Sequence, residues 1–122
     1  MTLKNTSNLP DFLGVGAPKC GTTSLHDILS EHPDIFLPPD KELHFFDNPE
    51  AYIKGPQWYA DQFVGNAMIK GEFTPAYMSY EATPERIFKT MGNKVKLIFM
   101  FREPVERAFS EYQHNYRRGL LN

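Results

Sequence analysis

"GVGAPKCGTTSL" (Gly14–Leu25) guides the interpretation of the whole chain, because it joins an apolar run to a helix-like segment through a glycine-rich turn. The run Asp11–Gly16 is short, apolar and ended by glycines, and Thr22–His32 carries three aliphatic residues at helical spacing. The stretch therefore predicts a strand, a tight loop and a helix. This order is typical of loops that hold phosphate-like anions at a helix N-terminus.

The glycine-rich turn departs from the two common nucleotide-binding patterns. A Walker loop has its lysine directly after the second glycine, where this chain has Thr22, and the glycine spacing also differs from a Rossmann fingerprint. What remains is Lys19, with the hydroxyls of Thr22, Thr23 and Ser24 at the expected helix start. Backbone N–H groups, hydroxyls and one ammonium there indicate a site for a tetrahedral anion. The alternative is an ordinary tight turn with an exposed lysine and a Thr or Ser N-cap.

The rest of the chain alternates between strand-like and helix-like segments. Val95–Phe101 ("VKLIFMF") is the most apolar run and is typical of a strand buried on both faces of a parallel sheet. Thr83 is expected to be the N-cap of a helix over Pro84–Met91, with Gly92 just past its end. We also expect an irregular His32–Glu50 with four prolines and a short extended piece at Ile35–Leu37, a helix within Gly55–Val64, a strand at Met68–Lys70, and a last helix from Pro104 through about Tyr116. The pattern predicts an α/β fold, a parallel sheet flanked by helices.

Composition limits the class of protein. With 122 residues, 41% of them hydrophobic, and a net charge of -2, we expect one soluble globular domain over residues 1–122. The acidic balance argues against a nucleic-acid partner. Met1–Pro10 lacks a signal-peptide pattern, no apolar stretch is long enough for membrane insertion, and Cys20 is the only cysteine, so a cytoplasmic location is the default expectation. The sequence gives no indication of oligomeric state.

A second anion site is indicated after the Val95–Phe101 run. Arg102 follows it directly, and Ser110 lies eight residues later, about two helical turns along the following segment. An arginine gives paired hydrogen bonds to a phosphate and a serine adds a third, whereas the alternative is an arginine ion-paired with Glu103 or Glu106 and an ordinary helix-face serine. Ligands of parallel sheets lie beyond the carboxyl ends of the strands, so both loops qualify. Together they predict a ligand charged at both ends.

Four segments carry a family resemblance. "PKCGTTSL" and "FREPVERAFSEY" resemble the paired signatures of sulfotransferases that use 3'-phosphoadenosine 5'-phosphosulfate. "KELHFFD" (Lys41–Asp47) is similar to the K-E-x-H-F-F segment of heparan-sulfate-type members, and "GEFTPAY" (Gly71–Tyr77) is similar to their E-x-[TS]-P-x-Y segment. The resemblance implies a P-loop-NTPase-like sulfotransferase fold. Because the family's domain is longer than this chain, and the chain's last residues still have a helical pattern, we expect the N-terminal portion of such a domain.

The resemblance also implies a donor and a set of site residues. The 5'-phosphosulfate of 3'-phosphoadenosine 5'-phosphosulfate would be bound by Lys19, Cys20, Gly21, Thr22, Thr23 and Ser24, and its 3'-phosphate by Arg102 and Ser110. Lys19 would neutralise charge on the leaving oxygen. Lys41 is a further candidate for binding sulfate, with an ordinary solvated loop lysine as the favoured alternative. Glu42 is the expected catalytic base, with His44 as its competitor. The acceptor would be a hydroxyl or amine of a small molecule or, as the heparan-like segment favours, a glycan, and no metal is expected.

Two other functions remain open at this point. A P-loop kinase or NTPase is favoured by the strand-loop-helix start, but opposed by the missing lysine-threonine pair and by the absence of an aspartate at the end of Val95–Phe101. A non-catalytic nucleotide-binding relic would lack the second half of the domain and bind without turnover. The aromatic residues of the middle segment either pack in the core or line an acceptor groove; they are Phe45, Phe46, Trp58, Tyr59 and Phe63. A nucleophilic Cys20 is not favoured, because no partner base is evident.

Overall fold

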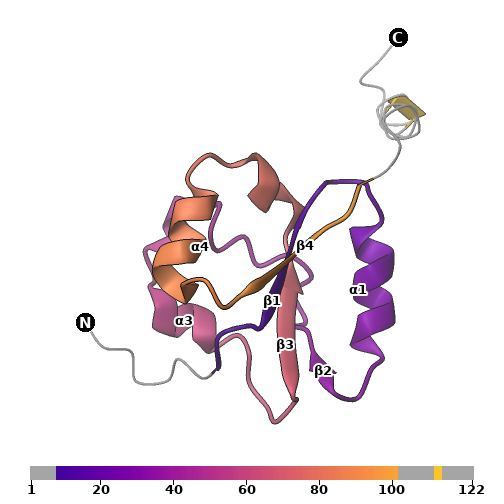
Figure 1. The fold of residues 1–122 in the computed structure, drawn as a ribbon, viewed down its shortest axis with the longest axis horizontal. Coiled ribbons are helices and arrows are strands. Elements are labelled where there is room, and N and C mark those ends of the chain that lie inside the picture. Colours follow the sequence, from indigo (N-terminus) through magenta and orange to yellow (C-terminus); the bar gives the residue numbers. More distant parts are fainter. Residues whose placement is uncertain (1–7, 102–111, 114–122) are drawn as a thin grey trace.

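A parallel sheet organises the molecule. The computed structural model describes residues 8–101 and 112–113, and within them the strands lie in the order β2-β3-β1-β4, all parallel. The strands are β1 (Phe12–Gly16), β2 (Ile35–Phe36), β3 (Ile69–Phe73) and β4 (Lys96–Phe99). The helices are α1 (Thr22–Ser30), α2 (Pro49–Tyr52), α3 (Pro56–Ala60), the 3-10 helix η2 (Pro75–Ser79) and α4 (Thr83–Met91). Figure 1 shows α1 on one side of the sheet and α3 and α4 on the other. The predicted α/β fold is confirmed.

Strands β1 and β3 pack closely through two reciprocal glycine–phenylalanine pairs. In their register Phe12 lies opposite Gly71, and Gly14 lies opposite Phe73. A Cβ built on Gly14 would lie 1.9 Å from Cδ1 of Phe73, and one built on Gly71 would lie 2.1 Å from Cζ of Phe12. The rings of Phe12 and Phe73 pack edge to face, with centroids 5.8 Å apart. Each ring therefore occupies space that any side chain on the facing strand would fill.

An aromatic core fixes the segment that follows β2. Phe45 stacks on Tyr59 with centroids 4.4 Å apart, and Phe46 packs edge to face on Tyr77. The buried cluster comprises Leu13, Val15, Phe45, Phe46, Ala51, Tyr59, Phe63, Tyr77 and Ile87, with Trp58 packed against it. Burying a large apolar side chain contributes about 1.5–3 kcal/mol, so these rings anchor the loop between β2 and α2. Of the two predicted roles for the aromatics, the core role is the one observed for Phe45, Phe46, Tyr59 and Phe63.

The prediction that Val95–Phe101 is buried on both faces is wrong. Only Lys96–Phe99 forms β4, and among the described strands it pairs with β1 alone, at one end of the sheet order. Leu97 and Phe99 are 45% and 48% exposed. An apolar run indicates how hydrophobic a strand is, but its place in the sheet depends on strand order, which periodicity does not encode.

Thr83 is not an N-cap, contrary to the prediction. It is the first residue of α4, Ala82 takes the cap position, and no side chain caps the helix. The Thr83 hydroxyl instead donates to the carbonyl of Phe46 at 3.4 Å, which ties α4 to the aromatic loop. The end of the helix follows the prediction, since Gly92 is the C-cap with φ 70°, a left-handed value that favours glycine.

The remaining predicted elements differ mainly in length. The strand expected at Met68–Lys70 extends over β3 and pairs on both sides, and the helix expected within Gly55–Val64 is limited to α3. The strand at the start, the α1 helix and the short extended piece at Ile35 are confirmed. Of the predicted last helix, Tyr112 and Gln113 are described and are helical, and the rest lies outside the described residues.

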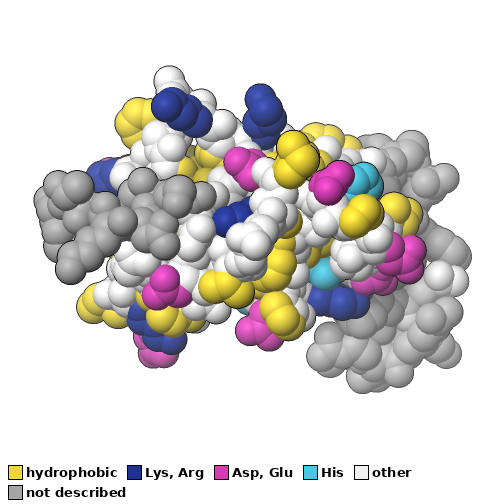
Figure 2. Space-filling model, turned by 90° about the horizontal axis from the view of Figure 1, so that it is seen from below, with side chains coloured by type: hydrophobic (Ala, Val, Ile, Leu, Met, Phe, Trp, Pro, Cys, Tyr) yellow, Lys and Arg dark blue, Asp and Glu magenta, His cyan; other side chains and the backbone are white. Residues whose placement is uncertain are grey.

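The surface charge and the apolar character of the helices are the features that concern binding partners and membranes. On the face shown in Figure 2, acidic and basic side chains are interspersed with hydrophobic ones. Within residues 8–101 and 112–113, no helix has both the length and the apolar character needed to cross a membrane.

Candidate functional site

The glycine-rich loop leads directly into the N-terminus of α1. Gly21 is the N-cap in a left-handed conformation, φ 94° and ψ 10°, and its carbonyl accepts the first helical hydrogen bond from Leu25 N at 3.1 Å. No side chain caps the helix, and no acidic residue lies in its first turn. The N–H groups of a first turn have no partner inside the helix. The alternative of a Thr or Ser N-cap is therefore wrong, and α1 presents its N–H groups and positive dipole end to a ligand.

Backbone hydrogen bonds hold this loop against the segment after β4. Ala17 N donates to the carbonyl of Met100 at 2.9 Å, and Met100 N donates to the carbonyl of Gly16 at 2.7 Å. Lys19 is exposed and left-handed, with φ 61°, whereas Cys20 is buried. These two hydrogen bonds tie the start of the loop to the residue after β4. Arg102 and Ser110, predicted for the second anion site, lie outside the described residues.

A small cavity joins this helix start to the Lys41–Asp47 segment. It measures about 30 Å³ and is lined by Thr22, Thr23, His26, Lys41, Glu42, Phe73 and Pro75. It lies where β3 ends at Phe73 and where α1 begins after β1, which is the edge of a parallel sheet at which ligands bind. Four predicted site residues therefore meet here: Thr22, Thr23, Lys41 and Glu42. Lys19, Ser24 and His44 are not among its lining residues.

His26 is a cavity residue that sequence reasoning missed. It lies one helical turn after Thr22, is 7% exposed, and packs edge to face on Phe73 with centroids 6.0 Å apart. Neither ring nitrogen has a hydrogen-bond partner among the described residues, although Nδ1 lies 3.7 Å from Oδ1 of Asp27. Buried polar groups are normally hydrogen-bonded, so these nitrogens offer bonding capacity beside the cavity. The signal in the sequence was a histidine four residues after Thr22, on the same helix face.

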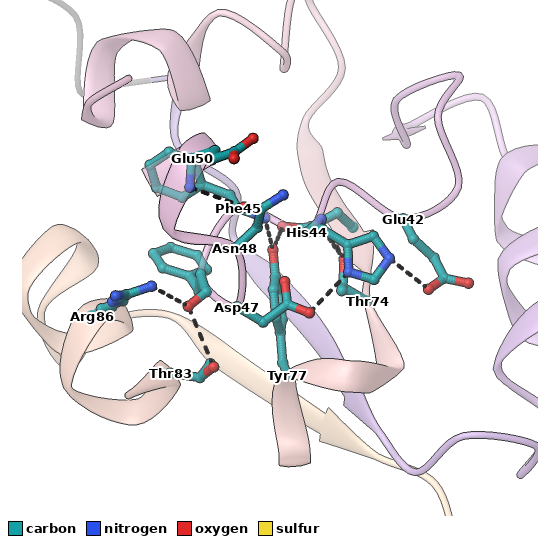
Figure 3. A network of polar contacts seen from close by, with 12 residues as sticks. Glu42, His44, Phe45, Asp47, Asn48, Glu50, Thr74, Tyr77, Thr83 and Arg86 are labelled. Carbon is teal, nitrogen blue, oxygen red and sulfur yellow. Dashed lines mark hydrogen bonds and ion pairs between the residues drawn. The ribbon is translucent and has the colours of Figure 1, made fainter. Parts of the chain in front are cut away.

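His44 lies between two carboxylates (Figure 3). Its Nδ1 is 2.9 Å from Oδ2 of Asp47, and its Nε2 is 3.2 Å from Oε1 of Glu42. Burial lowers the pKa of the imidazole, but the hydrogen bond to Asp47 and the charges of Asp47, Glu42 and Glu72 outweigh it, so the pKa lies above its ordinary value. Both ring nitrogens can donate to these carboxylates only in the protonated imidazolium. Asp47 was quoted in the "KELHFFD" segment but given no role.

A buried carboxylate lies beneath this loop. Glu72, on β3, is 1% exposed and accepts hydrogen bonds from the hydroxyls of Tyr59 (2.5 Å), Tyr77 (2.7 Å) and Thr74 (2.6 Å). Burial raises the pKa of Glu72, and the hydrogen bonds oppose this effect in part. Burial and the nearby Glu72 charge also raise the pKa values of Tyr59 and Tyr77, so both phenols stay protonated donors. The "GEFTPAY" segment contained three of these four residues without indicating that they meet.

Lys41 connects the two sides of the cavity. Its Nζ lies 3.4 Å from Oδ1 of Asp27 on α1, and both side chains are more than half exposed. Exposed ion pairs of this kind contribute little to stability, with a median of about 0–1 kcal/mol. The pair therefore orients the lysine at the cavity wall more than it holds the fold together.

The chain is similar to several known sulfotransferases. It is 42% identical over 106 residues to heparan sulfate glucosamine 3-O-sulfotransferase 5 of Mus musculus, covering 85% of this chain and 30% of the relative. It is 35% identical over 125 residues to bifunctional heparan sulfate N-deacetylase/N-sulfotransferase 2 of Homo sapiens, covering 95% of this chain and 14% of the relative. The chain thus spans less than a third of the length of either protein.

A solved structure agrees with these relatives. The crystal structure of a sulfotransferase from Alicyclobacillus acidocaldarius superposes with a TM-score of 0.77 at 35% identity, covering 93% of this chain and 52% of that one. Residues 9–122 match the family described as "Sulfotransferase domain". From the match over nearly the whole chain, together with the parallel sheet and the uncapped helix after the glycine loop, we conclude that this chain belongs to the sulfotransferase domain family.

Proposed function

We propose that this chain carries the donor-binding and proton-transfer part of a carbohydrate sulfotransferase. The protein would move a sulfuryl group from 3'-phosphoadenosine 5'-phosphosulfate to a hydroxyl or amine of a glycan. The observation that carries the proposal is the cavity in which Thr22 and Thr23, at an uncapped helix start, face Glu42. An anion site and a carboxylate on opposite sides of one small space are what group transfer to an acceptor oxygen or nitrogen requires.

The residues at the helix start fit a sulfonate-sized anion. The N–H groups of the first turn of α1, the hydroxyls of Thr22 and Thr23, and the N–H of the His26 ring supply hydrogen bonds, and Lys19 supplies positive charge. A cavity of about 30 Å³ has room for a small group and not for a whole nucleotide. The donor, when bound, supplies the activated sulfuryl group. Its nucleotide would extend outward toward the loop that Lys19 belongs to.

Glu42 is the better candidate for the base. The acceptor must lose a proton, and Glu42 lines the cavity, whereas His44 does not. An imidazolium held between Glu42 and Asp47 has no lone pair with which to accept a proton. His44 then orients Glu42 through the ion pair with its Oε1. Lys19 would offset the negative charge that develops on the leaving oxygen.

A glycan acceptor is proposed from the relatives. The two relatives described above are named for heparan sulfate. The cytoplasmic location and the absence of a metal requirement stay predictions from the sequence.

Ligand binding gives the first test. The product 3'-phosphoadenosine 5'-phosphate should raise the melting temperature, because it binds the folded protein only. At a ligand concentration 100 times Kd, the free energy of unfolding should increase by about 2.7 kcal/mol. ATP, with or without Mg²⁺, should stabilise the protein much less. Equal stabilisation by ATP, dependent on Mg²⁺, would favour a P-loop kinase or NTPase instead. Arg102→Ala should weaken product binding by about 1.5–3 kcal/mol, the range for a hydrogen bond to a charged group.

Turnover gives the second test. Mass spectrometry of glycans incubated with the sulfate donor should detect sulfated product, and addition of EDTA should leave the rate unchanged. Product binding without turnover would favour the non-catalytic relic.

A further inference from the structure

Two consecutive backbone N–H groups of the proposed catalytic loop end on hydroxyls that donate to one buried carboxyl group. The backbone of Leu43, the residue before them, also acts on that group, since its hydrogen bonding lowers the pKa of Glu72. His44 N donates to the hydroxyl of Thr74 at 3.4 Å, and Phe45 N donates to the hydroxyl of Tyr77 at 3.1 Å. Figure 3 shows the latter two contacts. Thr74 and Tyr77 lie 30 and 32 residues from their loop partners, so β3 and η2 hold the loop from a distant part of the chain.

The carboxyl group of Glu72 sets the orientation of the Thr74 and Tyr77 hydroxyls. A hydroxyl has one hydrogen to donate. Both Thr74 and Tyr77 donate it to Glu72, at 2.6 Å and 2.7 Å. Their oxygens therefore face the loop as acceptors, which is the role that a backbone N–H needs. The acceptor oxygens at position 72 therefore fix the two hydroxyls in this orientation.

The loop conformation needs such an anchor. His44 has φ 51°, in the left-handed region that a residue with a Cβ adopts at a cost. Here the anchor is an internal acceptor, because Glu72 is 1% exposed and accepts hydrogen bonds from the hydroxyls of Tyr59, Thr74 and Tyr77.

We propose that Glu72 is a positioning residue, an internal hydrogen-bond acceptor that holds the His44–Phe45 backbone through Thr74 and Tyr77, so that Glu42 reaches the cavity and His44 lies between its two carboxylates. The catalytic part of this inference rests on the proposed function. The loop-holding part does not, since it concerns hydrogen bonds within the protein.

Tyr59 provides a matched control for Tyr77. Both phenols are buried, both belong to the core cluster, and both donate to Oε2 of Glu72. Only the Tyr77 hydroxyl also accepts from the loop. Tyr59→Phe and Tyr77→Phe thus remove the same group and one hydrogen bond to Glu72, but only Tyr77→Phe releases the Phe45 N–H.

Amide hydrogen exchange followed by NMR tests the loop-holding part. Relative to Tyr59→Phe, Tyr77→Phe should lower the protection of the Phe45 amide by roughly 5- to 10-fold, the loss of one hydrogen bond. Thr74→Val should do the same at His44, Thr74→Ser should restore it, and Glu72→Gln should affect both amides. Equal local protection in Tyr59→Phe and Tyr77→Phe would overturn the proposal, and this comparison holds even if Glu72→Gln fails to fold.

Kinetics on the same variants test the catalytic part. Tyr77→Phe should lower kcat by roughly 10- to 100-fold through misplacement of Glu42, with KM for the donor and affinity for 3'-phosphoadenosine 5'-phosphate unchanged. Equal kcat in Tyr59→Phe and Tyr77→Phe would overturn it. If the wild-type protein fails to bind the nucleotide, the proposed function fails, while the exchange experiment still decides whether Glu72 holds the loop.

Discussion

The two walls of the cavity are built by different means. The glycine-loop wall, Pro18–Ser24, is placed by backbone geometry: left-handed Lys19 and Gly21, and a helix that begins at Thr22. The carboxylate wall, Lys41–Asp47, is placed by side chains from β3 and η2 that lie about thirty residues away in the chain. The first wall presents N–H groups and hydroxyls, and the second presents carboxylates and an imidazole.

This difference suggests that the glycine-loop wall binds the donor and that the carboxylate wall carries the reactive groups. A wall fixed by its own backbone suits a ligand that must always be held in the same way, such as a sulfonate at a helix N-terminus. A wall fixed by a polar network permits its reactive groups to be adjusted by substitutions elsewhere. Variants of the glycine-loop wall should therefore change donor affinity, and variants of the carboxylate wall should change turnover.

The substitution with the largest expected effect, Glu42→Gln, should change turnover without changing donor binding. Glu42→Gln keeps the shape of the side chain and removes its basicity, so kcat should fall by about 10²–10⁴-fold, the usual contribution of a general base. Binding of 3'-phosphoadenosine 5'-phosphate should be nearly unchanged. His44→Asn should lower kcat less. A Glu42→Gln enzyme with wild-type kcat, beside a folded but inactive His44→Asn enzyme, would transfer the role of base to His44.

Lys19→Ala should have the next largest effect, on the other wall. Loss of a hydrogen bond from a charged group should weaken nucleotide binding by about 1.5–3 kcal/mol, measured by calorimetric titration. Lys89→Ala is the control, because Lys89 is exposed and paired with Glu85 on α4, on the other side of the sheet from α1. Similar losses in both variants would show that the effect is one of net charge.

Gly21→Ala tests whether backbone shape carries the glycine-loop wall. An alanine at φ 94° should cost about 1–2 kcal/mol of stability, because the left-handed region is unfavourable for a residue with a Cβ. Gly55→Ala is the control, since Gly55 is the N-cap of α3 with φ 93°. Both variants should melt at lower temperature, but only Gly21→Ala should also bind the nucleotide more weakly. Unchanged affinity in Gly21→Ala would remove the argument for a backbone-shaped anion site.

The smallest expected effect concerns pH and the carboxylate wall. The pKa of His44 is raised in the folded protein, so its contribution to stability is fully present below the unfolded pKa and is lost as pH rises through the folded pKa. Asp47→Asn removes the hydrogen-bonded charge, and should therefore destabilise the protein more at about pH 5.5 than at about pH 8. Denaturant unfolding at both pH values measures the difference. An equal loss at the two values would mean that His44 is neutral in the folded protein.

Sequence reasoning succeeded where structure is local. Glycines bracket the β1–α1 loop, aliphatic residues repeat along α1, and Gly92 ends α4, and each of these features acts within a few residues. It failed for Thr83 and for the burial of Val95–Phe101, because the partner of a hydroxyl and the order of strands depend on tertiary contacts.

In the candidate site, too, the residues of local segments were predicted, and the contacts between distant segments were not. Glu42 and the hydroxyls of α1 were identified from their segments, and the structure brings Glu42, Thr22 and Thr23 to one cavity. The network around Glu72 was not anticipated, since it joins three elements across the sequence. A glutamate flanked by glycine and phenylalanine within a strand was the one available signal, because an unpaired buried carboxylate is costly and requires partners.

The reciprocal packing of β1 and β3 also constrains how the cavity can evolve. Gly14 admits the ring of Phe73, and that ring lines the cavity and packs on His26. A side chain gained at position 14 would first have to displace the ring, so the two positions can change together more readily than one at a time. Strand β1, which contributes no side chain to the cavity lining, thereby restricts which residues selection can place in that lining.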